Sequence, residues 1–229
     1  MQPDNPITIV IPVYNREATV ARTLGSIDAQ TVAPAAIVLV DNGSADASLS
    51  ILQQWASTRP GVTVAVEPRP GACAARNRGL AMVRTPFVMF FDSDDVMLPR
   101  HVEDFTRAIT EHPGVDIFGR DIMAENADGS RRRNYFSARW PMFSHLFRAS
   151  LGTARMVART ELVRRVGGWD ENLLGWDDFE LGVRMLLTSP RLHDLGGKPT
   201  VLTYATPGSL TGRSFTAHPE RWEPSLEAI

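Results

Sequence analysis

Three carboxylates fall within four residues at Asp92-Ser93-Asp94-Asp95. Carboxylates this close repel one another, and such clusters persist where a divalent cation neutralises them. Because no His or Cys stands nearby, oxygen ligands favour Mg²⁺ or Mn²⁺, which usually binds one or two protein carboxylates together with substrate phosphates. The alternative is a solvated acidic turn in which Asp95 starts the next helix. The apolar, strand-like run at 87–91 directly before the cluster favours the metal site.

Two further acidic groups fit either chemistry or local structure. Asp41 and Asn42 follow the apolar run at 37–40, so Asp41 suits an Asx turn as well as a ligand site at a strand end. Asp177 and Asp178 open a helical stretch, where carboxylates ordinarily act as caps. The alternative makes one of them a general base that the helix N-terminus keeps ionised.

The elements that must position these groups alternate between strand and helix. Apolar, β-branched runs predict strands buried on both faces at 7–11, 37–40, 62–66 and 86–91. Helical spacing separates them, which predicts an α/β fold with a mostly parallel central sheet flanked by helices. Loops at the carboxyl ends of parallel strands gather at one edge, where ligands bind. We therefore expect the loops at 14–15, 41–42 and 92–95 to face one crevice.

Other local expectations are more modest. Pro12 is expected to end the first strand, and Asn15 can cap the helix that follows it. The second half is less regular, with a strand expected at 115–118, a turn at 127–129 leading into 131–136, and a helix from Asp177 towards Leu187. For the aromatic-rich stretch Trp140–Phe147, core packing is favoured over an acceptor site or a membrane contact.

Bulk composition excludes several classes of protein. The 229 residues allow one sizeable α/β domain or at most two small ones, and the net charge of −2 gives no sign of a nucleic-acid partner. A single cysteine, Cys73, excludes a disulfide framework. The sequence shows neither a signal-peptide pattern nor an apolar run near the ~20 residues of a transmembrane segment, so a cytoplasmic protein is expected.

Five short motifs occur in order between residues 7 and 188. They are Ile9–Arg16, Val40–Asp46, Gly71 with Ala75–Gly79, Phe91–Asp95 with Pro99, and Gly167–Glu171 with Trp176–Asp178 and Arg184. Together they resemble the family 2 glycosyltransferases, which have the Rossmann-like GT-A fold of the nucleotide-diphosphosugar transferase superfamily.

The resemblance implies a role for each matched position. Contacts with the substrate or its nucleotide are implied for Pro12, Tyr14, Asn15, Asp41, Asn42, Arg76, Asp92, Ser93 and Asp177. Asp94 is implied as the ligand of a Mn²⁺ or Mg²⁺ ion, and Asp178 as the catalytic base. Asp177 stands where the family usually has Glu, which leaves open which of the pair is the base. The family's C-terminal histidine has no counterpart in the segment 204–209, so no histidine ligand is expected there.

The implied activity is an inverting, metal-dependent transfer of a sugar from a UDP- or dTDP-linked donor to an acceptor hydroxyl in cell-surface glycan or polysaccharide synthesis. The acceptor would be a glycan or a lipid-linked glycan, with a peripheral membrane contact as an option. One domain, 1–229, would hold a donor part at about 7–99 and an acceptor part at about 100–215.

Two alternatives remain. The first is a catalytically inactive domain of the same kind that only binds a nucleotide-sugar. The second is a sugar-nucleotide nucleotidyltransferase, which would usually carry a Gly-rich, basic loop where this chain has Pro12–Arg16. The fingerprints of dinucleotide-binding and P-loop enzymes do not occur.

Overall fold

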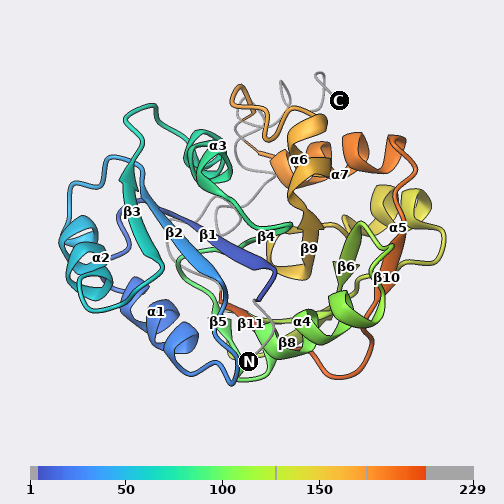
Figure 1. The fold of residues 1–229 in the computed structure, drawn as a ribbon, viewed down its shortest axis with the longest axis horizontal. Coiled ribbons are helices and arrows are strands. Elements are labelled where there is room, and N and C mark those ends of the chain that lie inside the picture. The colour runs from blue at the N-terminus through green and yellow to red at the C-terminus, as the bar shows by residue number, and fades with distance from the viewer. Residues whose placement is uncertain (1–4, 127, 174, 205–229) are drawn as a thin grey trace.

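A seven-stranded sheet organises the computed structural model, which describes residues 5–126, 128–173 and 175–204 (Figure 1). The strand order is β10-β6-β9-β4-β1-β2-β3, and every strand except β9 runs in the same direction. The strands are β1 (Ile7–Val13), β2 (Ala36–Asp41), β3 (Val62–Val66), β4 (Phe87–Phe90), β6 (Ile117–Gly119), β9 (Met156–Arg159) and β10 (Leu192–Asp194). The predicted α/β fold with a mostly parallel sheet is confirmed.

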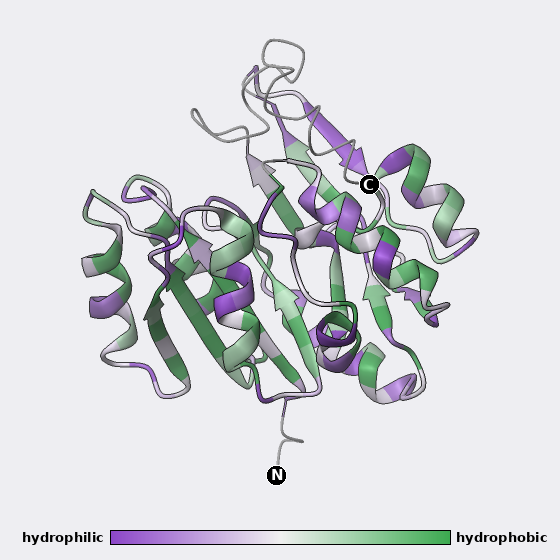
Figure 2. Ribbon diagram, turned by 90° about the horizontal axis from the view of Figure 1, so that it is seen from above, coloured by the Kyte–Doolittle hydropathy of each residue, from purple (hydrophilic) through white to green (hydrophobic). Residues whose placement is uncertain are grey.

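Helices cover both faces of this sheet. On one face lie α1 (Val20–Asp28), α2 (Ser48–Ala56) and α4 (His101–Glu111), and on the other lie α3 (Ala72–Met82), α6 (Thr160–Arg165) and α7 (Asp177–Leu187). Two buried clusters result, because alternate side chains of a strand point to opposite faces. In β1, Ile9 packs into one cluster and Val10 into the other, which explains the continuous β-branched run. Figure 2 shows the central strands of this sheet mainly in the hydrophobic colour.

The first strand is longer than predicted. β1 continues through Pro12, which pairs in register with Val40 of β2. The pairing of β1 with β4 already ends at Val10 and Phe90, so the missing N–H of Pro12 interrupts no ladder on that side. The expectation that Pro12 ends the strand was therefore wrong.

A second, smaller sheet was not anticipated from the sequence. It contains β5 (Val96–Met97), β11 (Val201–Tyr204), β7 (Ile122–Glu125) and β8 (Arg131–Asn134) in that order. These strands have only two to four residues, which is too short for a clear periodicity of apolar side chains. Two short helical segments remain, α5 (Pro141–Arg148) and the 3₁₀ turn η1 (Thr153–Arg155).

The strand order reverses at β1, since β2 and β3 lie on one side of it and β4 on the other. The carboxyl ends of β1 and β4 therefore flank the topological switch point at which open α/β sheets bind ligands. Within the described ranges, none of the helices is long and apolar enough to cross a bilayer.

Candidate active site

Asp41 ends β2 and uses its two carboxylate oxygens differently. Oδ2 accepts hydrogen bonds from the backbone N–H groups of Gly43 and Ser44, both at 3.1 Å. Oδ1 is buried and has no hydrogen-bond partner among the described residues. The Asx turn and the ligand site were alternatives at the sequence level. The structure forms the turn and also leaves one buried acceptor open.

Asn42 fixes the chain segment that leads into α3. Its Nδ2 donates to the carbonyl oxygens of Glu67 and Arg69 at 2.9 and 2.7 Å, and its Oδ1 accepts the N–H of Gly71 at 2.9 Å. The side-chain amide thus holds the loop after β3 beside the end of β2. Its contact with a nucleotide stays a prediction.

Asn15 joins the loops that follow β1 and β2. Its Oδ1 accepts the N–H of Ala45 at 2.8 Å, and its own N–H donates to the hydroxyl of Ser44 at 3.1 Å. Since α1 begins only at Val20, Asn15 is not its cap, and that expectation was wrong. Tyr14, next to it, is 56% exposed.

The acidic cluster lies directly across the switch point from the loop after β1. The carboxylate of Asp94 is 3.5 Å from Nε of Arg16, and the carbonyl oxygen of Ser93 accepts a hydrogen bond from the Thr19 hydroxyl at 3.4 Å. Ser93 itself is buried. The loops after β1, β2 and β4 are therefore neighbours at one edge of the sheet, as predicted.

Asp95 does not start a helix; it contacts the backbone of the smaller sheet. It is buried, it precedes β5, and its Oδ1 accepts the N–H of Tyr204 in β11 at 3.3 Å. The next helix, α4, begins only at His101. Burial, reinforced by the neighbouring carboxylates of Asp92 and Asp94, raises the pKa of Asp95 to about 9.

Arg76 of α3 connects two acidic groups that are far apart in the sequence. Its buried guanidinium donates to Asp177 at 2.6 Å and to Asp92 at 3.0 Å. The indole of Trp169 lies under the same guanidinium, 4.4 Å from ring centroid to Cζ. Arg76 therefore holds the end of β4 against the start of α7.

Asp178 lies in the first turn of α7, beside this ion-paired group. In the part of the chain that the structure describes, no side chain caps α7, and the carboxylate of Asp177 forms an ion pair with Arg76 instead. Burial is the main cause that raises the pKa of Asp178 to about 6, and the charge of Asp177 adds to it, while Arg76 opposes it. Ordinary helix capping thus does not explain the pair.

The donor set suits a hard cation. No three metal-binding side chains among the described residues already form a cage, but Mg²⁺ and Mn²⁺ need only one or two protein carboxylates when phosphates complete the shell. Asp94 offers such a carboxylate, and Asp92 lies two residues away on the same turn. Burial is the main cause of the raised pKa of Asp95, and the charges of Asp92 and Asp94 add to it; a cation at this turn would offset those charges.

Several residues of the site were not found from the sequence. The Thr153 hydroxyl donates to Asp92 at 3.3 Å, and Arg155 of the same turn is close enough to Asp178 to lower its pKa. The Nε of Arg155 is buried and has no hydrogen-bond partner among the described residues. Neither residue belongs to a motif, and only the pairing of β9 with β4 brings them here.

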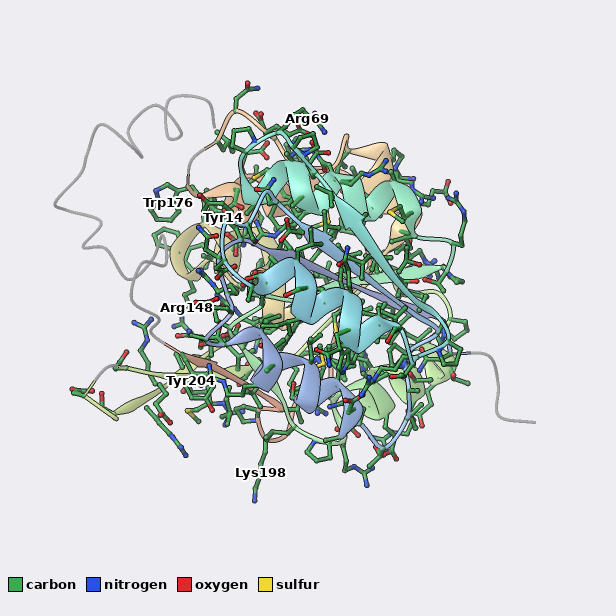
Figure 3. The ribbon with its side chains drawn as sticks, turned by 90° about the vertical axis from the view of Figure 1, so that its left-hand side faces the viewer. Tyr14, Arg69, Arg148, Trp176, Lys198 and Tyr204 are labelled. Atoms are coloured by element: carbon green, nitrogen blue, oxygen red, sulfur yellow. The ribbon has the colours of Figure 1, made fainter. Side chains whose placement is uncertain are left out.

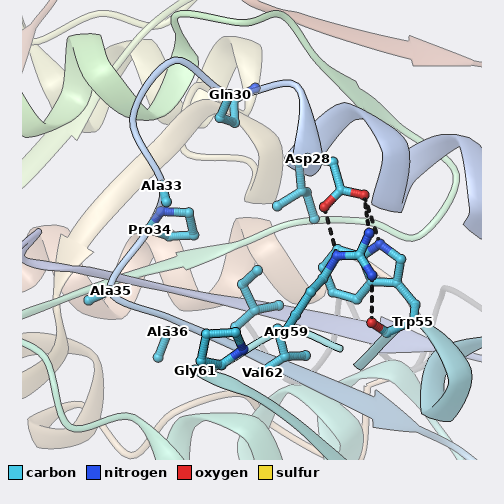
Figure 4. A pocket seen from close by; sticks show the side chains of 13 residues that line it. Asp28, Gln30, Ala33, Pro34, Ala35, Ala36, Trp55, Arg59, Gly61 and Val62 are labelled. Atoms are coloured by element: carbon cyan, nitrogen blue, oxygen red, sulfur yellow. Dashed lines mark hydrogen bonds and ion pairs between the residues drawn. The ribbon is translucent and has the colours of Figure 1, made fainter. Parts of the chain in front are cut away.

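One hollow of the structure lies away from this site. A cavity of about 230 Å³ opens beside Ala35, Gly61 and Val62, where β2 and β3 begin, and the Asp28–Arg59 ion pair closes one wall (Figure 4). It is at the opposite edge of the sheet from Asp41 and Asp92. It therefore has no part in the site described above. The exposed Tyr14 and the half-buried Trp176, in contrast, lie towards one margin of the molecule (Figure 3).

The model of the family described as Glycosyl transferase family 2 matches residues 8–165, which is more than half of the chain. The chain belongs to glycosyltransferase family 2. The matched range contains the loops after β1, β2 and β4 together with Arg76, and α7 with Asp178 follows it.

Individual relatives agree with this membership. Glycosyltransferase GlyA of Streptococcus pneumoniae is 36% identical over 126 residues, or 55% of this chain and 18% of that protein. The pre-mycofactocin glycosyltransferase of Mycobacterium tuberculosis is 29% identical over 198 residues, or 82% of this chain and 40% of its own length. The chain thus spans less than half of either relative.

Solved structures show the same fold. TarS from S. aureus in complex with UDP-GlcNAc superposes with a TM-score of 0.77 at 21% identity, covering 91% of this chain and 61% of that one. A mannosyltransferase from Pyrobaculum calidifontis in complex with GDP-Man and Mn²⁺ gives a TM-score of 0.65 at 21% identity, covering 94% and 60%. At these identities the likeness establishes the fold, which is GT-A.

Proposed function

We propose that this family 2 chain is an inverting, metal-dependent glycosyltransferase that moves a sugar from a UDP- or dTDP-linked donor to an acceptor hydroxyl. One observation carries the proposal. The buried Arg76 guanidinium ties Asp92, at the end of β4, to the first turn of α7, where Asp178 has its pKa raised to about 6. Asp92, a carboxylate suited to the diphosphate end of the donor, and Asp178, a carboxylate whose pKa suits a general base, thus belong to one proposed site.

Asp178 acts as the base in this scheme. Its carboxylate takes the proton of the acceptor hydroxyl, the oxygen attacks C1 of the donor sugar, and the bond from C1 to the diphosphate breaks. The nucleoside diphosphate leaves with the bonding electrons, and attack opposite the leaving group inverts the configuration at C1. A base with a pKa near 6 is mostly ionised at neutral pH and binds the proton more readily than an ordinary aspartate.

The diphosphate end belongs to the turn after β4. Asp94, with Asp92 beside it, would hold Mn²⁺ or Mg²⁺ together with oxygens of the donor's diphosphate. When bound, the cation supplies positive charge against the charge that develops on the leaving diphosphate. The guanidinium of Arg76 meanwhile keeps the Asp92 carboxylate in place.

The open oxygen of Asp41 supports a pyrimidine donor. Oδ2 is already occupied by two backbone N–H groups, so only Oδ1 remains to accept a hydrogen bond from a base. Uracil and thymine offer a single imide N–H flanked by carbonyls, whereas guanine presents two adjacent donors. One open acceptor therefore fits a uracil or thymine base better.

The two parts of the domain would divide the work. Residues 7–99 supply the donor side through the loops after β1, β2 and β4, and residues 100–215 supply the base and the acceptor side. Residues 205–215 lie outside the described part of the chain, and so do residues 205–209 of the segment that lacks the family's histidine. The acceptor would be a hydroxyl of a glycan or a lipid-linked glycan of the cell surface.

The test is the matched pair Asp178→Asn and Asp128→Asn, since Asp128 is an exposed residue of the β7–β8 turn. Wild type and Asp128→Asn should release nucleoside diphosphate from a UDP- or dTDP-sugar in the presence of Mn²⁺, and EDTA should suppress the release. Asp178→Asn should lose turnover by at least about 100-fold while the donor still raises its melting temperature.

Other results would point elsewhere. Normal turnover by Asp178→Asn would overturn the assignment of the base. Donor binding by the wild type without any turnover would favour the inactive binding domain. Formation of a sugar nucleotide from a nucleoside triphosphate and a sugar phosphate would identify a nucleotidyltransferase.

A further inference from the structure

Helix α5 presents large apolar side chains to solvent. Trp140, just before the helix, is 72% exposed, and within it Phe143 and Phe147 are 63% and 71% exposed. Leu146 is 52% exposed. We call these four side chains the aromatic face of α5. Core packing, favoured at the sequence level for Trp140–Phe147, was wrong for this face, and among the aromatic face's neighbours in the helix only His145 is buried.

The charge around this face has one sign. Residues 131–148 contain five arginines and no Asp or Glu, in a chain whose net charge is −2. Arg131 and Arg133 pair with carboxylates of β7 and its preceding turn. Arg132, Arg139 and Arg148 are exposed and have no carboxylate partner among the described residues. The segment is therefore a cationic, aromatic surface on a weakly acidic protein.

We propose that the aromatic face of α5 docks the protein on an anionic phospholipid bilayer. Helices that lie in the membrane interface combine Trp, Phe and Leu on one side with Arg or Lys around it, and anionic lipids attract the cationic groups. A hollow of about 330 Å³ between Arg139, Arg148 and the rings of Trp140 and Phe147 adds a place for a lipid headgroup. Its lining joins guanidinium groups, which bind phosphate, to aromatic rings.

A second copy of the chain fits this surface less well. In a twofold-symmetric dimer the same patch meets itself, so the three arginines without a carboxylate partner in the described part of the chain would face the same three arginines of the second copy. A bilayer of anionic lipids provides both the apolar depth and the opposite charge.

The docking helix is rigidly attached to the helix of the proposed base. The buried His145 of α5 donates from Nε2 to the carbonyl oxygen of Phe179 at 2.8 Å, and its Nδ1 accepts the N–H of Leu151 at 3.2 Å. The imidazole also stacks on the ring of Phe179, and it fills the space where Gly182 has no side chain. A bilayer that holds α5 therefore also orients α7.

This docking proposal rests on the proposed function, because docking would serve to bring a membrane-borne acceptor to the site of glycosyl transfer. Arg148 lies towards the same margin of the molecule as Tyr14 and Trp176 (Figure 3). The bilayer would thus present the acceptor hydroxyl on a lipid-borne glycan to the side of the molecule that carries the site.

The experiment is co-sedimentation of the whole chain with vesicles. Vesicles of phosphatidylcholine are compared with vesicles that also contain phosphatidylglycerol, at low and high salt. We expect binding only to the anionic vesicles and its loss at high salt. Trp140→Ser with Phe147→Ser should weaken binding about tenfold or more, and Arg139→Gln with Arg148→Gln about fivefold for each charge removed.

Matched controls use exposed residues elsewhere. Leu187→Ser removes an equally exposed apolar side chain at the end of α7, and Arg107→Gln removes a surface arginine of α4. Both should bind vesicles like the wild type. All variants should keep the melting temperature of the wild type, because every substituted side chain is exposed.

Three outcomes would overturn the docking surface. They are no binding to anionic vesicles, binding that the α5 variants leave unchanged, and a dimer in sedimentation equilibrium that Trp140→Ser dissociates. Stabilisation by a nucleotide-sugar is measured on the same samples. Loss of vesicle binding with donor binding and turnover intact overturns this proposal alone, whereas absence of turnover with vesicle binding intact overturns only the proposed function.

Discussion

The protonation of Asp178 gives the sharpest test of the proposed reaction. Burial first, and the charge of Asp177 second, raise its pKa to about 6. The base must be ionised to take a proton, so the rate should follow the ionised fraction on the acidic side. At about pH 5, roughly a tenth of a group with this pKa is ionised, against roughly nine-tenths of an ordinary aspartate. We therefore expect kcat/KM to fall about tenfold for each pH unit below about pH 6.

Asp177→Asn is the matched perturbation. It removes the second cause of the raised pKa and leaves Arg76, which lowers the pKa, in place. The acidic limb of the variant should move to lower pH, so that the variant keeps a larger share of its plateau rate at about pH 5. The plateau rates are compared separately, because each profile is normalised to its own maximum.

The assay measures initial rates of nucleoside diphosphate release from a UDP- or dTDP-sugar between about pH 4.5 and 8 at fixed Mn²⁺. Melting temperatures over the same range show that the fold persists. A wild-type profile that stays flat down to about pH 5 would refute the raised pKa. A limb that moves to higher pH in Asp177→Asn would refute the electrostatic account of it.

The remaining predictions concern the residues that hold the site together and the proposed cation. Arg76→Met removes the buried partner of two half-buried carboxylates and should lower the free energy of unfolding by about 1–3 kcal/mol in a denaturant titration. An unchanged midpoint would contradict a stabilising role of these ion pairs. In Gly182→Ala the new Cβ would lie 2.2 Å from Nε2 of His145, so we expect a loss of about 1–3 kcal/mol. Its control, Gly25→Ala, meets no atom within 4 Å in an exposed helical position and should gain about 0.5–1 kcal/mol. Asp94→Asn should remove the part of donor-induced thermal stabilisation that depends on Mn²⁺, and equal stabilisation with and without Mn²⁺ in the wild type would count against the cation.

The sequence alone determined the parallel sheet and the places where its strands end. Runs such as Ile7–Ile11 and Phe87–Phe91 are continuous because both faces of the sheet are covered, and that pattern is local. Polar residues directly after such runs lie at one edge as a consequence of strand direction, so the common edge of the sheet at which Asp41 and Asp94 lie could be predicted. The motifs then indicated the family without any knowledge of contacts.

Only the tertiary structure decided how these residues act on one another. The link from Asp92 through Arg76 to Asp177 joins three distant segments, and burial against that link raises the pKa of Asp178. The same holds for the aromatic rings of α5, whose sequence suits a buried core as well as a membrane surface. Which face of a helix meets solvent depends on what packs against it, and here His145 is the side chain that faces α7.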